Sequence, residues 1–294
     1  MASTAGRSGT AGRSGTAGRS GTGAGSGAGA GPATGGGTGA RASLHQLVYR
    51  LYGRRLAAGV DRDRVPRHVA VMLDGNRRWA RSVGGTDIDG HRTGAGRIRD
   101  LLGWCDEVGV EVVTIWLLST DNLSRSPAEV AALVEIIDTT VQELAATGHW
   151  RIHPLGALDL LPAETALSLK SAADSTADRP GMLVNVAIGY GGRQEIADAV
   201  RSLLQEHARA GTSIEELADV LDVEHIAEHL YTRGQPDPDL IIRTSGEQRM
   251  SGFLLWQSAH SELYFCEAYW PAFRKVDFLR ALRSYAQRHR RFGA

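Results

Sequence analysis

Long apolar stretches and polar clusters alternate along the chain. Four of these stretches have the continuity of strands that are buried on both faces, and they cover residues 68–73, 110–118, 182–188 and 240–242. Between them, apolar residues recur at helical spacing, as in the segment that carries Ile98, Leu101, Leu102, Cys105 and Val108. A shorter candidate strand lies near 150–155. This alternation predicts a single α/β domain with a mostly parallel central sheet flanked by helices.

Each of the four long strands ends at a polar cluster. The clusters cover residues 74–78, 119–125, 189–193 and 243–251. The carboxyl ends of parallel strands lie at one edge of a sheet, where α/β proteins bind ligands, so we expect these clusters to form one site. The polar side chains gathered there are Asp74, Arg77, Arg78, Asp121, Asn122, Arg125, Arg243, Arg249 and Ser251.

The chemistry of this set indicates a phosphorylated ligand. Arginines hold phosphate oxygens in bidentate fashion, and a carboxylate such as that of Asp74 can hold a divalent cation. Several arginines with few acids fit a diphosphate better than a sugar or a peptide. The alternative is a salt-bridged cluster that only stabilises the fold.

Glycines follow the third strand, and turn-forming acids precede the fourth. At Gly191 and Gly192 the missing side chains let the backbone approach a ligand or a neighbouring loop closely. Neither G-x-G-x-x-G nor G-x-x-x-x-G-K-[ST] occurs, so the sequence gives little support to a nucleotide site. Asp237 and Asp239 stand before the fourth strand, which places them at the opposite pole and favours a role in the turn.

Residues 1–42 differ in composition from the rest. The hexapeptide Thr-Ala-Gly-Arg-Ser-Gly occurs three times from Thr4 to Gly21. Too few apolar side chains are present to offset chain entropy, which predicts a disordered tail before a catalytic domain at 43–294. This domain is expected to open with an amphipathic helix over 44–52. The tail has no apolar run of the length of a signal peptide or membrane anchor.

Charge and cysteine content narrow the function further. The chain has 33 Lys and Arg against 33 Asp and Glu, so no overall positive charge points to nucleic acid. Cys105 and Cys266 lie on apolar segments without metal-ligand spacing. That placement is typical of reduced core thiols and favours a cytoplasmic protein.

Motifs spread over the folded part of the chain together resemble the cis-prenyltransferases, the family of undecaprenyl diphosphate synthase. They are Asp-Gly-Asn-Arg-Arg-Trp-Ala at 74–80, Ser-Thr-Asp-Asn at 119–122, Gly-Tyr-Gly-Gly-Arg at 189–193 and Arg-Thr-Ser-Gly-Glu-Gln-Arg-Met-Ser at 243–251, with Glu262 beyond. The resemblance runs in order from Pro66 to Gly293, and such a set is far more specific than one short motif.

The resemblance implies an enzyme that condenses isopentenyl diphosphate with an allylic diphosphate, forms a Z double bond and encloses an apolar tunnel. Mg²⁺ is the implied cofactor, with Asp74 and Glu262 as its ligands. Asp74 and Asn122 are the implied catalytic residues, the latter by assisting proton removal from the isopentenyl carbon. The implied substrate-binding residues are Gly75, Asn76, Arg77, Arg78, Trp79, His91, Ser119, Thr120, Asp121, Leu123, Arg125, Arg243, Arg249, Met250 and Ser251.

The two halves of the implied site come from different motifs. Gly75 to Arg78 would cradle the allylic diphosphate, with His91 near it. Arg243, Arg249 and Ser251 resemble the isopentenyl diphosphate pocket.

Three positions differ from the bacterial long-chain members of the family. Asp87 stands where those members carry an arginine, and Leu123 where they carry Trp. Leu117 replaces a small residue, and a bulkier wall would shorten the tunnel. We therefore expect a short product such as a Z-farnesyl diphosphate, from geranyl diphosphate or a similar starter. A long-chain polyprenyl diphosphate synthase is the alternative, because the leucines also suit ordinary core packing.

Two further classes of protein stay open. An aspartyl-phosphate phosphatase also places Asp at a strand end, but it needs a second acid where Asn76 stands. A non-catalytic partner subunit would have lost Asp74 and the phosphate arginines, which this chain keeps. Family members commonly form homodimers, and residues 291–293 resemble the ending that reaches into the partner's site; contact with a membrane surface stays open.

Overall fold

The computed structural model describes residues 64–288, together with residues 53, 55–56 and 59. The expected tail at 1–42, the expected helix at 44–52 and the C-terminal motif at 291–293 lie outside these residues. The described residues belong to one compact unit, Gln46–Ala294.

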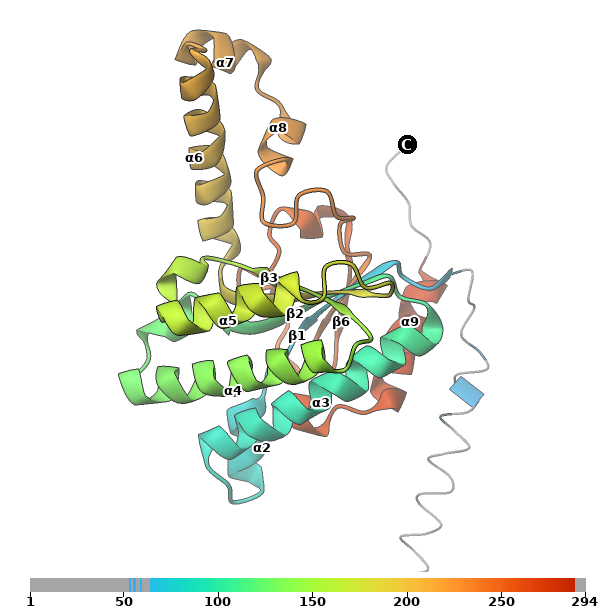
Figure 1. Ribbon diagram of the computed structural model, residues 1–294. Helices are drawn as coiled ribbons and strands as arrows, with labels where there is room; N and C mark the ends of the chain where they lie inside the picture. Colours follow the sequence, from blue (N-terminus) through green and yellow to red (C-terminus); the bar gives the residue numbers. More distant parts are fainter. Residues whose placement is uncertain (1–52, 54, 57–58, 60–63, 289–294) are drawn as a thin grey trace, which may run out of the picture. The chain divides into compact units, whose positions relative to one another are not determined.

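The centre of this unit is a six-stranded parallel sheet with the order β3-β4-β2-β1-β5-β6 (Figure 1). Five strands match stretches expected from the sequence, which confirms the parallel α/β fold. The apolar pattern of the sequence does not predict β6, because its four residues are only partly buried and form a short edge strand. The strands are β1 (His68–Met72), β2 (Val112–Ser119), β3 (Arg151–Leu155), β4 (Leu183–Tyr190), β5 (Leu240–Arg243) and β6 (Glu262–Phe265).

Helices pack around this sheet. In Figure 1, α3, α4 and α5 lie side by side across it, whereas α6 and α7 form an arm that projects away, with α8 returning beside α6. None of the described helices combines the length and apolarity needed to cross a membrane. The helices of the described residues are α2 (Asn76–Ser82), α3 (Asp87–Val108), α4 (Pro127–Ala146), α5 (Ala163–Asp174), α6 (Gly192–Ala210), α7 (Ile214–Val220), α8 (Val223–Ala227) and α9 (Lys275–Gln287).

Alternation along the strands divides the apolar core in two. Val69 and Val71 of β1 belong to the larger cluster, which also contains side chains of α3, α4 and α9. Ala70 and Met72 belong to a smaller cluster with Phe253. β1 is therefore buried on both faces, as its continuous apolar sequence indicates, and the packing fixes the position at which it ends.

The helix α3 begins earlier than the sequence indicates. The glycines predict a loop over 84–90, but Thr86 and Asp89 form a reciprocal capping box that starts the helix at Asp87. Gly90 consequently lies inside α3, where a Cβ atom would come within 2.3 Å of the Asn76 carbonyl oxygen. The glycine allows α3 to pack directly on the start of α2.

A chain of hydrogen bonds crosses the buried amino end of the sheet. His68 is 1% exposed and donates through Nδ1 to the Pro236 carbonyl oxygen (2.7 Å), because that oxygen can only accept. Its Nε2 then accepts from the Thr114 hydroxyl (2.8 Å), whose oxygen accepts from Asn185 (2.9 Å). Burial lowers the pKa of His68 from 6.5 to about 4, so the folded protein holds a neutral imidazole here.

We expect the free energy of unfolding to fall by up to about 3 kcal/mol between about pH 7 and about pH 4, because the unfolded chain protonates His68 first. Denaturant unfolding at several pH values measures this loss. His68→Asn should make the pH dependence shallower without abolishing it, because the pKa of His91 is also lowered to about 4, whereas the exposed control His149→Asn should keep the wild-type slope. A wild-type slope in His68→Asn would show that another group titrates.

Candidate active site

A cavity of about 470 Å³ opens at the carboxyl edge of the sheet. Its wall is built from the ends of β1, β2 and β5 and from the helices α2, α3 and α4. The strand ends therefore meet in one place, as the parallel topology predicts. Predicted site residues that line the cavity are Asp74, Gly75, Asn76, Arg77, Arg78, His91, Ser119, Asp121, Asn122, Arg125, Arg243, Arg249 and Ser251.

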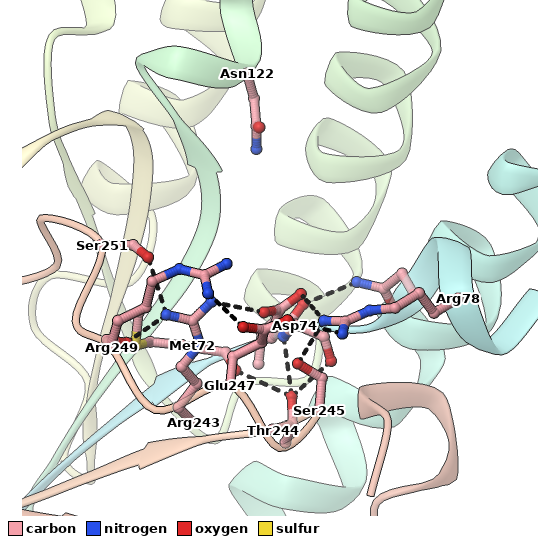
Figure 2. A network of polar contacts seen from close by, with 12 residues as sticks. Met72, Asp74, Arg78, Asn122, Arg243, Thr244, Ser245, Glu247, Arg249 and Ser251 are labelled. Carbon is pink, nitrogen blue, oxygen red and sulfur yellow. Dashed lines mark hydrogen bonds and ion pairs between the residues drawn. The ribbon is translucent and has the colours of Figure 1, made fainter. Parts of the chain in front are cut away.

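Asp74 is the central acid of this cavity. Its Oδ2 accepts a hydrogen bond from Arg243 (2.8 Å) and its Oδ1 accepts one from Arg78 (3.3 Å) (Figure 2). The backbone N–H of Asp74 donates to the Thr244 hydroxyl (2.9 Å). Burial acts to raise the pKa of Asp74, but hydrogen bonds from Arg243 and Ser245 outweigh it and lower the pKa below 3.8. Asp74 is therefore ionised at neutral pH.

Arg243 connects Asp74 to the loop that follows β5. Its side chain is 6% exposed. Besides Asp74, the guanidinium donates to the Ser251 hydroxyl (2.9 Å) and to the Arg249 carbonyl oxygen (Figure 2). A buried guanidinium is costly unless it is paired, so these partners hold Arg243 in one orientation. The side chain of Arg249 is 63% exposed.

The glycines after β4 pack against the loop that follows β5. The Gly192 N–H donates to the Gly252 carbonyl oxygen (2.8 Å), and a Cβ atom on Gly192 would come within 2.7 Å of that oxygen. A Cβ atom on Gly191 would lie 2.6 Å from the Thr120 hydroxyl oxygen. Of the two possibilities that the glycines raise, the structure thus shows close approach to neighbouring loops.

Glu247 belongs to the charged network although neither the strand-end pattern nor the family resemblance predicts a role for it. Its carboxylate pairs with Nη1 of Arg78 (3.0 Å) and with Arg249 (Figure 2). These ion pairs lower the pKa of Glu247, that with Arg249 most strongly. An acid in a loop gives no indication of a partner such as Arg78, which lies 169 residues away. Only its place between the arginines of the 243–251 motif could have suggested a role.

Asn122 is oriented by Arg125. The Asn122 Oδ1 accepts from Arg125 (2.7 Å), which also pairs with Glu129 (2.8 Å). Because a guanidinium can only donate, the amide oxygen of Asn122 faces Arg125 and its NH₂ group is left for the cavity. Figure 2 shows this side chain pointing toward the Asp74 network. Asn122 therefore offers a bound molecule a hydrogen-bond donor and is not itself a base.

His91 lies beside the same arginines. Burial, and then the positive charges of Arg125 and Arg77, lower its pKa to about 4, so its imidazole is neutral at physiological pH. Its Nε2 is buried and has no hydrogen-bond partner among the described residues. A ring nitrogen in this state, on the cavity wall, is suited to a hydrogen bond with a bound ligand.

Gly75 and the first turn of α2 form a cradle at the mouth of the cavity. Gly75 has a φ of +100°, and a Cβ atom there would come within 2.7 Å of the Tyr269 ring. No side chain caps the N-terminus of α2. Its first backbone N–H groups therefore suit an anion.

The far part of the cavity wall is apolar. It is formed by Ile98, Leu117, Leu133, Ile136 and Ile137. Leu117, which the resemblance places in a tunnel wall, thus lines the cavity. With a charged end and an apolar end, the cavity matches a ligand that has an anionic head and a hydrocarbon chain.

Several predicted site residues do not line this cavity. Leu123 and Met250 pack against the two apolar clusters, and the Thr120 N–H donates to the Tyr190 carbonyl oxygen. Leu123 and Met250 therefore contribute to the packing around the site. The residues outside the lining are Trp79, Thr120, Leu123, Met250 and Glu262.

The structure separates Glu262 from Asp74. Glu262 is level with Leu240 at the amino end of β5, whereas Asp74 follows the carboxyl end of β1. Its carboxylate pairs with Arg288 (2.5 Å). Within a single chain, Asp74 and Glu262 therefore do not reach the same metal ion, because groups at opposite ends of parallel strands cannot meet.

Comparison with known proteins agrees with this geometry. A family model described as putative undecaprenyl diphosphate synthase matches residues 72–293. A (2Z,6E)-farnesyl diphosphate synthase of Thermobifida fusca is 66% identical over 247 residues, which cover 84% of this chain and 97% of that protein. An isoprenyl transferase 1 of Streptomyces avermitilis is 60% identical over 253 residues, which cover 86% and 98% of the two chains.

A solved structure shows the same fold. The lavandulyl diphosphate synthase of Lavandula x intermedia, in complex with dimethylallyl diphosphate, matches with a TM-score of 0.74 at 34% identity. The match covers 79% of this chain and 100% of that one. The chain belongs to the cis-prenyltransferases, the family of undecaprenyl diphosphate synthase. Its chemistry is the transfer of prenyl groups.

Proposed function

We propose that the chain condenses isopentenyl diphosphate with geranyl diphosphate or a similar short allylic diphosphate, and that it forms a short product with a new Z double bond. The observation that carries this proposal is a cavity that combines several arginines with an apolar wall to which Leu117 belongs. The name of the similar protein from Thermobifida fusca supports it.

The two diphosphates would bind on opposite sides of Asp74. Arg78 and the cradle at Gly75 belong to the allylic side, together with His91. Arg243, Arg249 and Ser251 belong to the isopentenyl side. This division follows the two groups of contacts, because Asp74 lies between Arg78 and Arg243.

The residues suit the chemistry of this condensation. As the allylic C–O bond breaks, negative charge grows on the leaving diphosphate, and arginines fixed beside it stabilise that charge. The apolar wall keeps water away from the allylic cation while the new C–C bond forms. Asn122, held by Arg125, donates a hydrogen bond to the diphosphate of the isopentenyl substrate and so orients its hydrocarbon part. The proton lost from the isopentenyl carbon passes to the departing diphosphate, whose oxygens become basic as their negative charge grows.

Asp74 is the proposed ligand for Mg²⁺. Mg²⁺ is commonly bound by one or two carboxylates together with substrate phosphates, and an ionised Asp74 on the cavity wall fits that pattern. When bound, the ion would supply positive charge to the diphosphate. A second copy of the chain would be needed to bring Glu262 to this ion, which accords with the homodimer that the resemblance implies.

Two other proposals concern the cellular location of the protein and whether it is catalytic. A cytoplasmic location is supported by Cys105 and Cys266, both buried and without a disulfide. A non-catalytic role is disfavoured because Asp74, Arg78 and Arg243 are present and meet in one network.

The test is to incubate the purified protein and Mg²⁺ with isopentenyl diphosphate and, separately, dimethylallyl, geranyl or farnesyl diphosphate. Mass spectrometry then sizes the products and NMR assigns the new double bond. We expect a single addition to geranyl diphosphate that gives a Z-farnesyl product. Long polyprenyl products would contradict the short chain length, and no product with any starter would contradict the enzymatic proposal.

Leu117→Ala should lengthen the main product by at least one isoprene unit, because it deepens the apolar end of the cavity. Leu118→Ala is a matched control, since Leu118 is 1% exposed in the core but does not line the cavity. The control should be less stable, by about 2–5 kcal/mol, and keep the wild-type product. Mass spectrometry measures the length of the products. An unchanged product length in Leu117→Ala would show that Leu117 does not control chain length.

A further inference from the structure

Six of the nine residues of the 243–251 motif do not line the cavity, and three of these six are consecutive and form a turn. We call Ser245, Gly246 and Glu247 the linking turn. It follows β5 and lies between Arg243 and Arg249, which both line the cavity. No residue of this turn is used by the function proposed above.

The linking turn has a conformation that requires support. Ser245 has a φ of +83°, in the left-handed region that residues other than glycine rarely adopt, and Gly246 follows with a φ of +75°. The backbone N–H of Ser245 donates to the Ala268 carbonyl oxygen (2.8 Å), and that of Gly246 donates to Cys266 (2.9 Å). The segment after β6 therefore holds the turn in place. Such strain persists where the surroundings enforce it, often at functional sites.

The strained serine contacts the two central charges of the site. The Ser245 hydroxyl oxygen accepts from Nη2 of Arg78 (2.7 Å) (Figure 2), and the same hydroxyl helps to lower the pKa of the Asp74 carboxylate. A Cβ atom on Gly75 would come within 3.0 Å of the Ser245 Cβ. The turn after β5 thus presses directly against the turn after β1.

Glu247 holds the other nitrogen of the same guanidinium. It accepts from Nη1 of Arg78 (3.0 Å) and pairs at the same time with Arg249. The ring of Tyr269 lies under Arg78, with its centroid 5.6 Å from the guanidinium carbon. Together with Asp74, these groups surround an arginine whose side chain is 41% exposed.

An arginine on the surface of a cavity has many rotamers, and ordering it during binding weakens the affinity for a ligand. A guanidinium that is already oriented avoids this loss. We propose that Ser245 and Glu247 are positioning residues that fix Arg78 for the allylic diphosphate. Because Glu247 also pairs with Arg249, it connects Arg78 to the isopentenyl side of the site. The inference rests on the proposed function, which assigns the two sides.

The first test compares Ser245→Ala with Ser245→Gly in steady-state kinetics. Both variants lack the hydroxyl, so both should raise the KM for geranyl diphosphate about tenfold and leave the KM for isopentenyl diphosphate within about twofold. Glycine adopts a positive φ without strain, so Ser245→Gly should melt at a higher temperature than Ser245→Ala. A loss of binding that is independent of stability separates positioning from a structural role.

The second test uses Glu247→Gln, which should raise the KM of both substrates about threefold because both arginines lose their charged partner. Ser258→Ala is the control, since its hydroxyl bonds the Leu255 carbonyl oxygen and Ser258 does not line the cavity. It should keep both KM values. If Ser245→Ala does not fold, Ser245→Gly carries the test, because it relieves the strain.

Wild-type KM values for geranyl diphosphate in both Ser245 variants would overturn the inference. A wild-type protein that makes no product would overturn the proposed function instead. In that case, calorimetric titration with inorganic diphosphate tests how the linking turn affects binding without requiring turnover. Ser245→Ala should bind this probe about tenfold more weakly than wild type, and equal affinity would refute the positioning role.

Discussion

The carboxylate of Asp74 is the contact on which the site depends. It is shared by Arg78, four residues away, and by Arg243, which lies 169 residues away in the sequence. Without this acid, two guanidinium groups would repel each other in a cavity where one of them is almost fully buried. The shared carboxylate lets both cations stand side by side, so that two polyanions can bind next to one another.

The parallel sheet makes this arrangement possible. β1 is paired with β2 on one side and with β5 on the other, so the loops after these three strands leave the sheet together. Burial of β1 on both faces fixes the position of Asp74. Helices α3 and α4 then add the apolar wall. Most of the apolar wall thus comes from these two helices, and Leu117 of β2 adds to it.

Sequence reasoning works where one segment carries its own signal. Strands such as β1 are continuously apolar, and their ends identify Asp74 and Arg243 directly. It fails where the signal depends on distant partners. Glu247 and Ser245 have a role only through their contacts with Arg78, and no local sequence pattern reveals these contacts. The place of Glu262 is likewise not readable from the sequence, because a motif does not tell which end of a short edge strand its acid occupies.

The most direct test of this account is the rate of product formation by Asp74→Asn with saturating substrates, measured in a single turnover. Asn keeps the shape of the side chain but removes the charge that Arg78 and Arg243 share. The account predicts a rate lower by about 100-fold or more in a folded protein. Asp100→Asn, which removes an exposed ion pair with Arg97 on α3, should keep the wild-type rate. An unchanged rate in Asp74→Asn would contradict the central role of this carboxylate.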